Sequence, residues 1–225
     1  MIPQIIHQVW EGKTERLPKQ FIQFAETWKE HHPNWQYEFW NKKRMDAFVR
    51  KYYPEFADIY FGYGYDVQRW NAIRYLILYK TGGVYVDFDC ECLKPMDAHL
   101  QGKTCCFGLE PEEYAKMYRQ PFIISNAWIA SESNHPFLKK IIETLPKINS
   151  TATDKINVVV ETTGSIMLTN VYHRYPCSFE KACNRRIPFL RVQAPILFRR
   201  FSQCVRPPSH EQNRERYNRV GAGSV

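Results

Sequence analysis

Two aspartates, Asp87 and Asp89, stand two residues apart at the end of an apolar stretch of the sequence. Carboxylates beside apolar residues are costly to bury unless a positive charge lies between them. A divalent cation supplies that charge, and oxygen ligands select hard ions such as Mn²⁺ or Mg²⁺, which keep open positions for substrate phosphates. The pair predicts metal-assisted chemistry on a phosphate-bearing substrate, whereas two solvated aspartates in a turn would show the same spacing.

The residues before this pair predict a helix followed by a strand. Apolar side chains recur at helical spacing over residues 67–77, and Asn71 and Arg74 share a second face, one turn apart. The glycine pair at 82–83 ends this helix, because glycine adopts the left-handed conformation of a C-cap. Residues 84–89 then alternate as a strand does, which predicts that both carboxylates leave the strand from one face.

An aspartyl-phosphate phosphohydrolase is an alternative interpretation of the pair, because that class also has an apolar strand ending in D-x-D, with the first carboxylate as nucleophile. Such enzymes normally have Thr or Val two residues after the second aspartate, where this chain has Glu91. They also need a later acidic pair, and no Asp-Asp or G-D-x-x-x-D follows in this sequence. The pattern therefore favours a metal site over a phosphohydrolase.

Strand-like and helix-like stretches alternate along the rest of the chain, which predicts a mixed α/β fold with a nucleotide-type sheet in its first half. No internal repeat or long linker interrupts them, so we expect a single domain. The expected strands, besides 84–89, cover residues 2–10, 35–40, 104–109, 122–130 and 192–198. The expected helices, besides the one that ends at the glycine pair, cover residues 19–30, 42–52, 135–145 and 165–175.

The composition is that of a folded protein rather than a disordered or fibrous one. The 225 residues are 44% apolar and 15% aromatic, which is enough to bury a sizeable core. No run approaches the roughly 20 apolar residues of a membrane span, and the first residues read as a strand rather than a secretory signal. Seven cysteines at irregular spacing favour free buried thiols over disulfides or structural zinc. We therefore expect a cytoplasmic protein.

The positive charge is concentrated at the C-terminal end. Residues 174–225 contain eleven basic and three acidic side chains, which accounts for the whole net charge of +8. Such a segment favours polyanions, whether nucleic acid, anionic lipid headgroups or a diphosphate-bearing substrate. A solvated basic tail without a partner would have the same composition.

Three blocks of the sequence resemble the family-32 glycosyltransferases with a DXD sugar-binding region. They are IPQIIHQVWEG at residues 2–12, N-x-x-R-Y-x-x-L-Y-x-x-G-G-V-Y-x-D-x-D at residues 71–89, and L-K-P-x-D at residues 93–97. The resemblance continues weakly through residues 124–126 and 162–169. It implies a GT-A type fold, a central mixed sheet flanked by helices, in a single domain over residues 1–225. Residues 1–110 would bind the nucleotide sugar and metal, and residues 111–225 would face the acceptor.

The resemblance also implies roles for individual residues on the donor side. Trp10 would stack on the donor base, with the backbone of Val9 beside it, although a core tryptophan is the simpler alternative. Tyr85 would pack near the base. Asp87 would contact the ribose and the metal, and Asp89 would be the main metal ligand.

Four further residues complete the implied site. Arg74 would reach the donor sugar or diphosphate, where its planar, permanent charge suits the task, and would act with the two aspartates as a catalytic residue. Family members usually have Asp three residues before this arginine, whereas Asn71 here would hydrogen-bond sugar hydroxyls without adding charge. Asn126 and Glu110 are weaker candidates near the acceptor, and both are more often structural.

The implied activity is metal-dependent transfer of a hexose, with retention of configuration, from a nucleotide-sugar donor to a saccharide acceptor. By resemblance the donor would be UDP-linked, the acceptor lipid-linked, and the pathway bacterial surface polysaccharide assembly. The basic segment would hold the chain peripherally on the anionic inner face of the plasma membrane. Retention would follow from same-face attack, with a diphosphate oxygen accepting the acceptor's proton.

Two other function classes remain open. A basic nucleic-acid-binding module would use the C-terminal segment, but no helix-turn-helix, RNP or zinc pattern accompanies it, so we expect no nucleic-acid partner. A catalytically impaired sugar-nucleotide-binding protein would follow from an incomplete lid. The His-rich segment and Ser-Trp pair that close the family's site have only a faint echo here, at His210 and residues 223–225.

Overall fold

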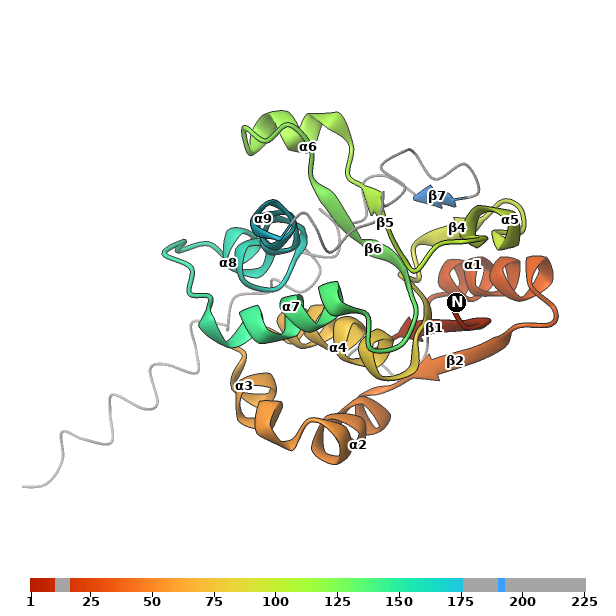
Figure 1. Cartoon of the computed structure of the whole chain (residues 1–225), viewed down its shortest axis with the longest axis horizontal. Coiled ribbons are helices and arrows are strands. Elements are labelled where there is room, and N and C mark those ends of the chain that lie inside the picture. The colour runs from red at the N-terminus through yellow and green to blue at the C-terminus, as the bar shows by residue number, and fades with distance from the viewer. Residues whose placement is uncertain (11–16, 176–189, 193–225) are drawn as a thin grey trace, which may run out of the picture. The chain divides into compact units, whose positions relative to one another are not determined.

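A five-stranded mixed sheet forms the centre of the structure, a computed structural model that describes residues 1–10, 17–175 and 190–192 (Figure 1). The strand order is β2-β1-β3-β6-β5. The first three of these strands are parallel, and β6 and β5 are each antiparallel to the strand before them in that order. The strands are β1 (Ile5–Val9), β2 (Gln36–Trp40), β3 (Gly83–Val86), β5 (Cys105–Leu109) and β6 (Ile124–Ser131).

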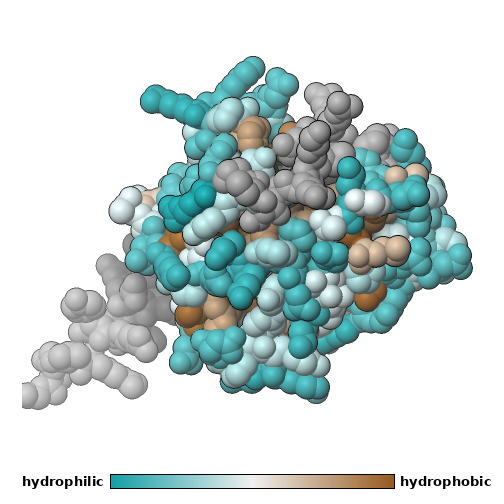
Figure 2. All heavy atoms as spheres, in the orientation of Figure 1, coloured by the Kyte–Doolittle hydropathy of each residue, from teal (hydrophilic) through white to brown (hydrophobic). Residues whose placement is uncertain are grey.

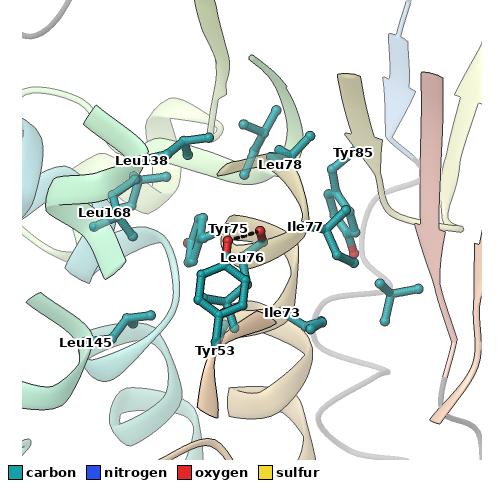
Figure 3. Close-up of a cluster of buried hydrophobic side chains, with 14 of the residues drawn as sticks. Tyr53, Ile73, Tyr75, Leu76, Ile77, Leu78, Tyr85, Leu138, Leu145 and Leu168 are labelled. Carbon is teal, nitrogen blue, oxygen red and sulfur yellow. Dashed lines mark hydrogen bonds between the residues drawn. The ribbon is translucent and has the colours of Figure 1, made fainter. Parts of the chain in front are cut away.

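Helices cover both faces of this sheet (Figure 1). On one face Trp28 of α1 (Lys19–His31) packs in a cluster with Ile6 and Val84. The other face is covered by α2 (Lys42–Tyr52), α4 (Asp66–Thr81), α7 (Pro136–Thr144) and α9 (Ser165–Arg174), whose apolar side chains surround Tyr85 in the larger cluster (Figure 3). The predicted α/β fold with a mixed sheet flanked by helices is therefore confirmed.

The remaining elements are short. They are η1 (Pro54–Phe56), α3 (Ala57–Gly62), β4 (Cys90–Cys92), α5 (Asp97–Leu100), α6 (Glu112–Met117), η2 (Leu145–Lys147), α8 (Lys155–Thr162) and β7 (Leu190–Val192), which pairs antiparallel with β4. The sequence pattern did not predict these helices or β4. Isolated helices this short are unstable in water and form only where tertiary contacts hold them.

The strand before the two aspartates is shorter than predicted. Val84 and Val86 lie on the α1 face and Tyr85 lies on the α4 face, so the predicted alternation is confirmed up to that point. β3 ends at Val86, however, and a turn closed by the Cys90 N–H donating to the Asp87 carbonyl (3.1 Å) follows. The expectation that both carboxylates project from one face of a strand over residues 84–89 is therefore wrong.

The glycine pair ends α4 as predicted. Gly82 has a φ of +67°, and its N–H donates to the Leu78 carbonyl (2.9 Å). A Cβ added at Gly82 would lie 2.7 Å from the Pro3 ring. Gly83 has a φ of +102°, and a Cβ added there would lie 2.7 Å from the Ile5 carbonyl oxygen. The pair therefore supplies both the conformation and the space that let the chain pass directly from α4 into the centre of the sheet.

Other predictions agree with the structure to within a few residues. The expected strands at 2–10, 35–40, 104–109 and 122–130 and helices at 19–30, 42–52, 135–145 and 165–175 all form, with ends shifted by one to three residues at most. Of the expected strand at 192–198 the structure describes only Val192, in β7. The lid echo at His210 and residues 223–225 and most of the basic segment lie outside the described residues.

Hydrophilic residues cover most of the face seen in Figure 2, and hydrophobic residues show there only in small separate patches. The apolar mass of the described chain is instead inside, where Cys105 and Cys106 enter clusters on opposite faces of the sheet as their adjacent positions predict. Cys90, Cys92 and this pair are free and buried. Among the described residues no helix is long and apolar enough to cross a membrane.

Candidate active site

The candidate site lies at the carboxyl ends of the parallel strands β1 and β3. His7 pairs with Tyr85 in the parallel register, so Val9 falls level with Asp87 two residues later along both strands. Substrates of open α/β sheets bind outside this edge. The topology therefore brings Val9 and Trp10 from the N-terminus to the same edge as the two aspartates, as the resemblance implied.

A buried ring fixes the turn that carries the aspartates. Phe88 is fully buried, and its ring contacts Phe21 of α1 (centroids 6.3 Å apart), Phe39 of β2 (6.0 Å) and Trp10 (6.1 Å). On the other side, the Asp87 N–H donates to the Ala127 carbonyl of β6 (2.8 Å). These contacts fix the backbone of the turn from three elements. The carboxylates on either side of Phe88 therefore extend from a rigid backbone.

The Asp87 carboxylate is held by two side chains from the α4 side of the sheet. The Tyr85 hydroxyl donates to Asp87 Oδ1 (2.5 Å), and Nη2 of Arg74 lies 3.6 Å from the same oxygen. The Asp87 side chain is 12% exposed. Asp89 is more deeply buried, with Cys90 Sγ 3.7 Å from its Oδ1. The hydroxyl and the guanidinium together orient the Asp87 carboxylate.

The Arg74 guanidinium lies inside the protein. Nη1 donates to the Asn126 carbonyl (2.6 Å), Nε donates to the Trp70 carbonyl (3.1 Å), and the group lies over the Tyr85 ring, 4.5 Å from its centroid. Burial favours the neutral form, yet the negative charge of Asp87 keeps the pKa of Arg74 above its ordinary value. In this geometry Arg74 positions Asp87, and its predicted contact with the donor diphosphate stays a prediction.

Tyr85 lies on the α4 face of the sheet. Its ring is 1% exposed and belongs to the cluster that includes Ile73 and Ile77 of α4 (Figure 3). Its hydroxyl reaches the site at Asp87. The predicted packing of Tyr85 near the donor base stays a prediction.

Asn71 and Asn126 belong to a polar network between α4, β6 and the end of α8. Asn71 Nδ2 donates to Thr163 Oγ1 (3.2 Å) and its Oδ1 accepts from Asn126 Nδ2 (3.3 Å). The same Asn126 amide lies 3.3 Å from the hydroxyl of Tyr75, which donates to the Thr163 carbonyl (3.1 Å). Asn71 is buried and Asn126 is half-buried, so their described contacts are structural and their predicted sugar contacts remain predictions.

Glu110 directly follows β5, and its carboxyl group interacts electrostatically with Asp87 and Asp89. Burial raises its pKa; a hydrogen bond with Ser125 opposes the rise, and the negative charges of Asp87 and Asp89 add to it. The interaction places Glu110 on the site's side of the sheet, whereas its predicted contact with the acceptor is untested. Three carboxylates share this region with the guanidinium of Arg74, whose pKa the two aspartates also raise.

The donor set fits a hard divalent cation. Asp87 and Asp89 offer carboxylate oxygens at the edge of the sheet, and such oxygens are the ligands that Mg²⁺ and Mn²⁺ prefer. Within the described part of the chain, no group of three His, Cys, Asp or Glu is close enough together to hold a metal by itself. Asp87 and Asp89 would therefore provide two ligands, and substrate phosphates and water would complete the shell, as Mg²⁺ and Mn²⁺ allow.

Trp10 is half-buried at the end of β1, and its ring meets Phe21 edge-on (centroids 5.6 Å apart) and Phe88 in the same way. Its indole N–H is buried and has no hydrogen-bond partner in the part of the chain that the structure describes. An unpaired buried donor costs free energy, which a ligand's acceptor atom would recover. The ring is thus partly a core residue, and its stacking on a donor base stays a prediction.

The sequence pattern did not indicate that Phe88, Tyr75 and Thr163 contribute to the site. Phe88 lies between the two aspartates and looked like an ordinary strand residue, while Tyr75 and Thr163 are 88 positions apart in the sequence. The only signal for Thr163 was the weak resemblance of residues 162–169, which here supply the end of α8 and the start of α9 against α4.

Residues 18–106 match the family model described as the glycosyltransferase sugar-binding region containing DXD motif. Inositol phosphoceramide mannosyltransferase 1 of Schizosaccharomyces pombe is 34% identical over 177 residues, which cover 77% of this chain and 52% of that protein. A mannosyl phosphorylinositol ceramide synthase of Saccharomyces cerevisiae is 30% identical over 175 residues, covering 78% of this chain and 43% of that protein. The chain thus spans about half the length of the curated relatives it matches.

The solved structure of the PaToxG glycosyltransferase has the same fold, with a TM-score of 0.56 at 17% sequence identity, over 78% of this chain and 70% of that one. The family match in sequence and the shared fold are both consistent with an acidic turn at the edge of the sheet. The chain belongs to the family of glycosyltransferases whose sugar-binding region contains a DXD motif.

Proposed function

We propose that the chain transfers a hexose from a nucleotide-sugar donor to a lipid-linked acceptor, using a divalent cation held by Asp87 and Asp89. The observation that carries this proposal is the rigid acidic turn at the carboxyl edge of β1 and β3, with Asp87 held by Tyr85 and Arg74. A solvated pair of aspartates in a loop would have no such buried support.

The chain's own residues would act mainly by orientation and charge. Tyr85 and Arg74 would orient the Asp87 carboxylate, and the buried Phe88 ring would hold the turn in place. A bound Mn²⁺ or Mg²⁺ would neutralise charge on the departing nucleoside diphosphate. Transfer would retain the anomeric configuration, with a diphosphate oxygen taking the acceptor's proton.

The names of the relatives support the sugar and the acceptor. Both curated relatives described above are mannosyl-transferring enzymes named for inositol phosphoceramide or its mannosyl product. We propose mannose as the hexose and a lipid with a phosphate-containing headgroup as the acceptor. The family resemblance supports a UDP-linked donor. The basic composition of residues 174–225 supports placement on the cytoplasmic face of the plasma membrane and, with it, a role in surface polysaccharide assembly.

The test is hydrolysis of UDP- and GDP-linked sugars, with and without Mn²⁺, by the wild type, by Asp89→Ala and by the control Asp58→Ala. Asp58 is an exposed carboxylate on α3, so its loss removes the same charge without touching the turn. We expect metal-dependent release of one nucleotide, reduced at least about a hundredfold in Asp89→Ala and unchanged in Asp58→Ala.

Equal release by all three proteins would overturn the proposed site. If no donor is hydrolysed, titration calorimetry with the same nucleotide sugars decides between the remaining classes. Donor binding that depends on Asp89 would identify a catalytically impaired sugar-nucleotide-binding protein. DNA binding that survives loss of both aspartates, without any donor binding, would identify the basic nucleic-acid-binding module.

A further inference from the structure

A groove of about 460 Å³ lies beside the edge strand β2, on the side of the sheet away from α1. It is bounded by β2, α2 and the end of α4. None of the described residues that line it belongs to the acidic turn or to the residues that hold the turn. The lining runs along β2 from Gln36 to Trp40 and reaches Thr81 at the end of α4. Because it shares none of those described residues with the acidic turn, the groove is a separate site.

Two ammonium groups at the rim of this groove lie beside the same aromatic ring. Nζ of Lys51 on α2 lies 5.0 Å from the centroid of the Tyr52 ring, and Nζ of Lys80 on α4 lies 4.9 Å from the same centroid. The two charges are therefore less than about 10 Å apart by geometry alone. Both lysines are exposed, and neither forms an ion pair with any residue in the described ranges.

The acidic group in the groove is already occupied. Glu38 is the only acidic residue among the described lining residues, and its carboxylate binds Arg44 and the Gln36 amide. These hydrogen bonds and the Arg44 charge outweigh burial and lower the pKa of Glu38. Arg44 in turn lies over the Trp40 ring, 3.9 Å from its centroid. With the Glu38 and Arg44 charges cancelling, the two lysines give the groove an excess of two positive charges.

The floor of the groove is uncharged and largely apolar. Trp40 and Phe48 are buried aromatic residues that line it together with Ile5. His7 adds no charge, because burial lowers its pKa to about 4. Its two ring nitrogens are also engaged: Nδ1 accepts from the Trp40 indole (3.2 Å) and Nε2 lies 2.9 Å from the Gly82 carbonyl.

We propose that this groove binds the phosphate headgroup of an anionic lipid. A phosphate between Lys51 and Lys80 would satisfy both ammonium groups, and the apolar part of the lipid next to the phosphate would cover the part of the floor that solvent reaches, at Ile5 and the 39% exposed Tyr52 ring. A free phosphate ion would use the rim and leave that floor in water. The groove would thus seat the described part of the chain on an anionic membrane, independently of the basic C-terminal segment and of the transfer reaction.

The experiment is titration calorimetry of the full chain with monomeric dihexanoylphosphatidic acid and, separately, with inorganic phosphate. The test variant is Lys51→Gln/Lys80→Gln. Its matched control is Lys43→Gln/Lys116→Gln, which removes the same charge from exposed lysines outside the groove. With about 1 kcal/mol for each lysine near an anionic lipid, we expect the groove variant to bind lipid about thirtyfold more weakly. The control should stay within about twofold of the wild type.

Each alternative result has a definite meaning. Lipid binding that is absent in the wild type, or that both variants weaken equally, would overturn the groove as the site. Inorganic phosphate that binds as tightly as the lipid would show that the apolar floor contributes nothing, and would overturn the lipid assignment. Nucleotide-sugar hydrolysis should be the same in wild type and groove variant, and it therefore serves as the measure of correct folding.

Discussion

Replacing Arg74 with methionine tests whether this arginine stabilises the fold through Asp87. The two charged groups lie 3.6 Å apart, and their side chains are 4% and 12% exposed. At an effective dielectric constant of about 20, Coulomb's law gives an attraction of about 4.6 kcal/mol over that distance. Because the desolvation of both groups offsets part of it, we expect a coupling free energy of about 2 to 4 kcal/mol between Arg74 and Asp87.

The assay is a double-mutant cycle in urea denaturation with Arg74→Met, Asp87→Asn and the double variant. Arg74→Met should lower the free energy of unfolding by about 3 to 5 kcal/mol, since it removes the cation beside a nearly buried carboxylate. Adding Asp87→Asn should return part of that loss, because the amide has the same shape and no charge. The lost hydrogen bonds to the Asn126 and Trp70 carbonyls occur on both sides of the cycle and cancel.

Arg44→Met is the matched control, because Arg44 pairs with Glu38 at the surface, where its side chain is 43% exposed. Surface pairs contribute about 0 to 1 kcal/mol, so this variant should change stability little. A coupling free energy below about 0.5 kcal/mol between Arg74 and Asp87 would refute the positioning role. Arg74 would then have to act on the substrate rather than on the aspartate.

Three further substitutions test other parts of the structure. Tyr85→Phe keeps the buried ring and removes only the hydroxyl that donates to Asp87, so unfolding free energy should fall by about 1.5 to 3 kcal/mol in urea; no change would mean that this hydrogen bond is not made. Gly83→Ala places a Cβ 2.7 Å from the Ile5 carbonyl at a φ of +102°, and should lower the unfolding free energy by more than about 2 kcal/mol; wild-type thermal stability would refute the close approach. The third variant is His7→Gln. Burial in the folded state lowers the pKa of His7 from 6.5 to about 4, so the unfolded state binds the proton first as pH falls. The free energy of unfolding therefore decreases as pH falls from 6.5 towards 4. Between pH 7 and pH 5 the wild type should lose about 2 kcal/mol more than His7→Gln, and parallel pH profiles would contradict the burial of a neutral imidazole.

Local periodicity was sufficient to predict the elements that carry the site. The spacing of apolar residues in α4, the glycine pair at 82–83 and the alternation of Val84, Tyr85 and Val86 all act over a few residues, and the structure agrees with each. The end of β3 was not predictable in this way. Phe88 continues the apolar alternation in the sequence. In the structure its ring instead packs on Phe21 and Phe39 from distant elements, and the chain turns there.

The sequence by itself determined which chemical groups are present and how those on one element are spaced: two carboxylates two residues apart, and Asn71 and Arg74 one turn apart on one helix. Family membership followed from the same local blocks. These features depend on helix and strand geometry, which is the same in every protein.

Tertiary structure decided what each group faces. It turned Arg74 inward to Asp87 and buried the Tyr85 ring so that its hydroxyl donates to the same carboxylate. It also placed Lys51 of α2 and Lys80 of α4 around one tyrosine ring. Such meetings depend on how the helices pack on the sheet, and packing is set by the combined shape and burial of many distant side chains, which no short stretch of sequence contains.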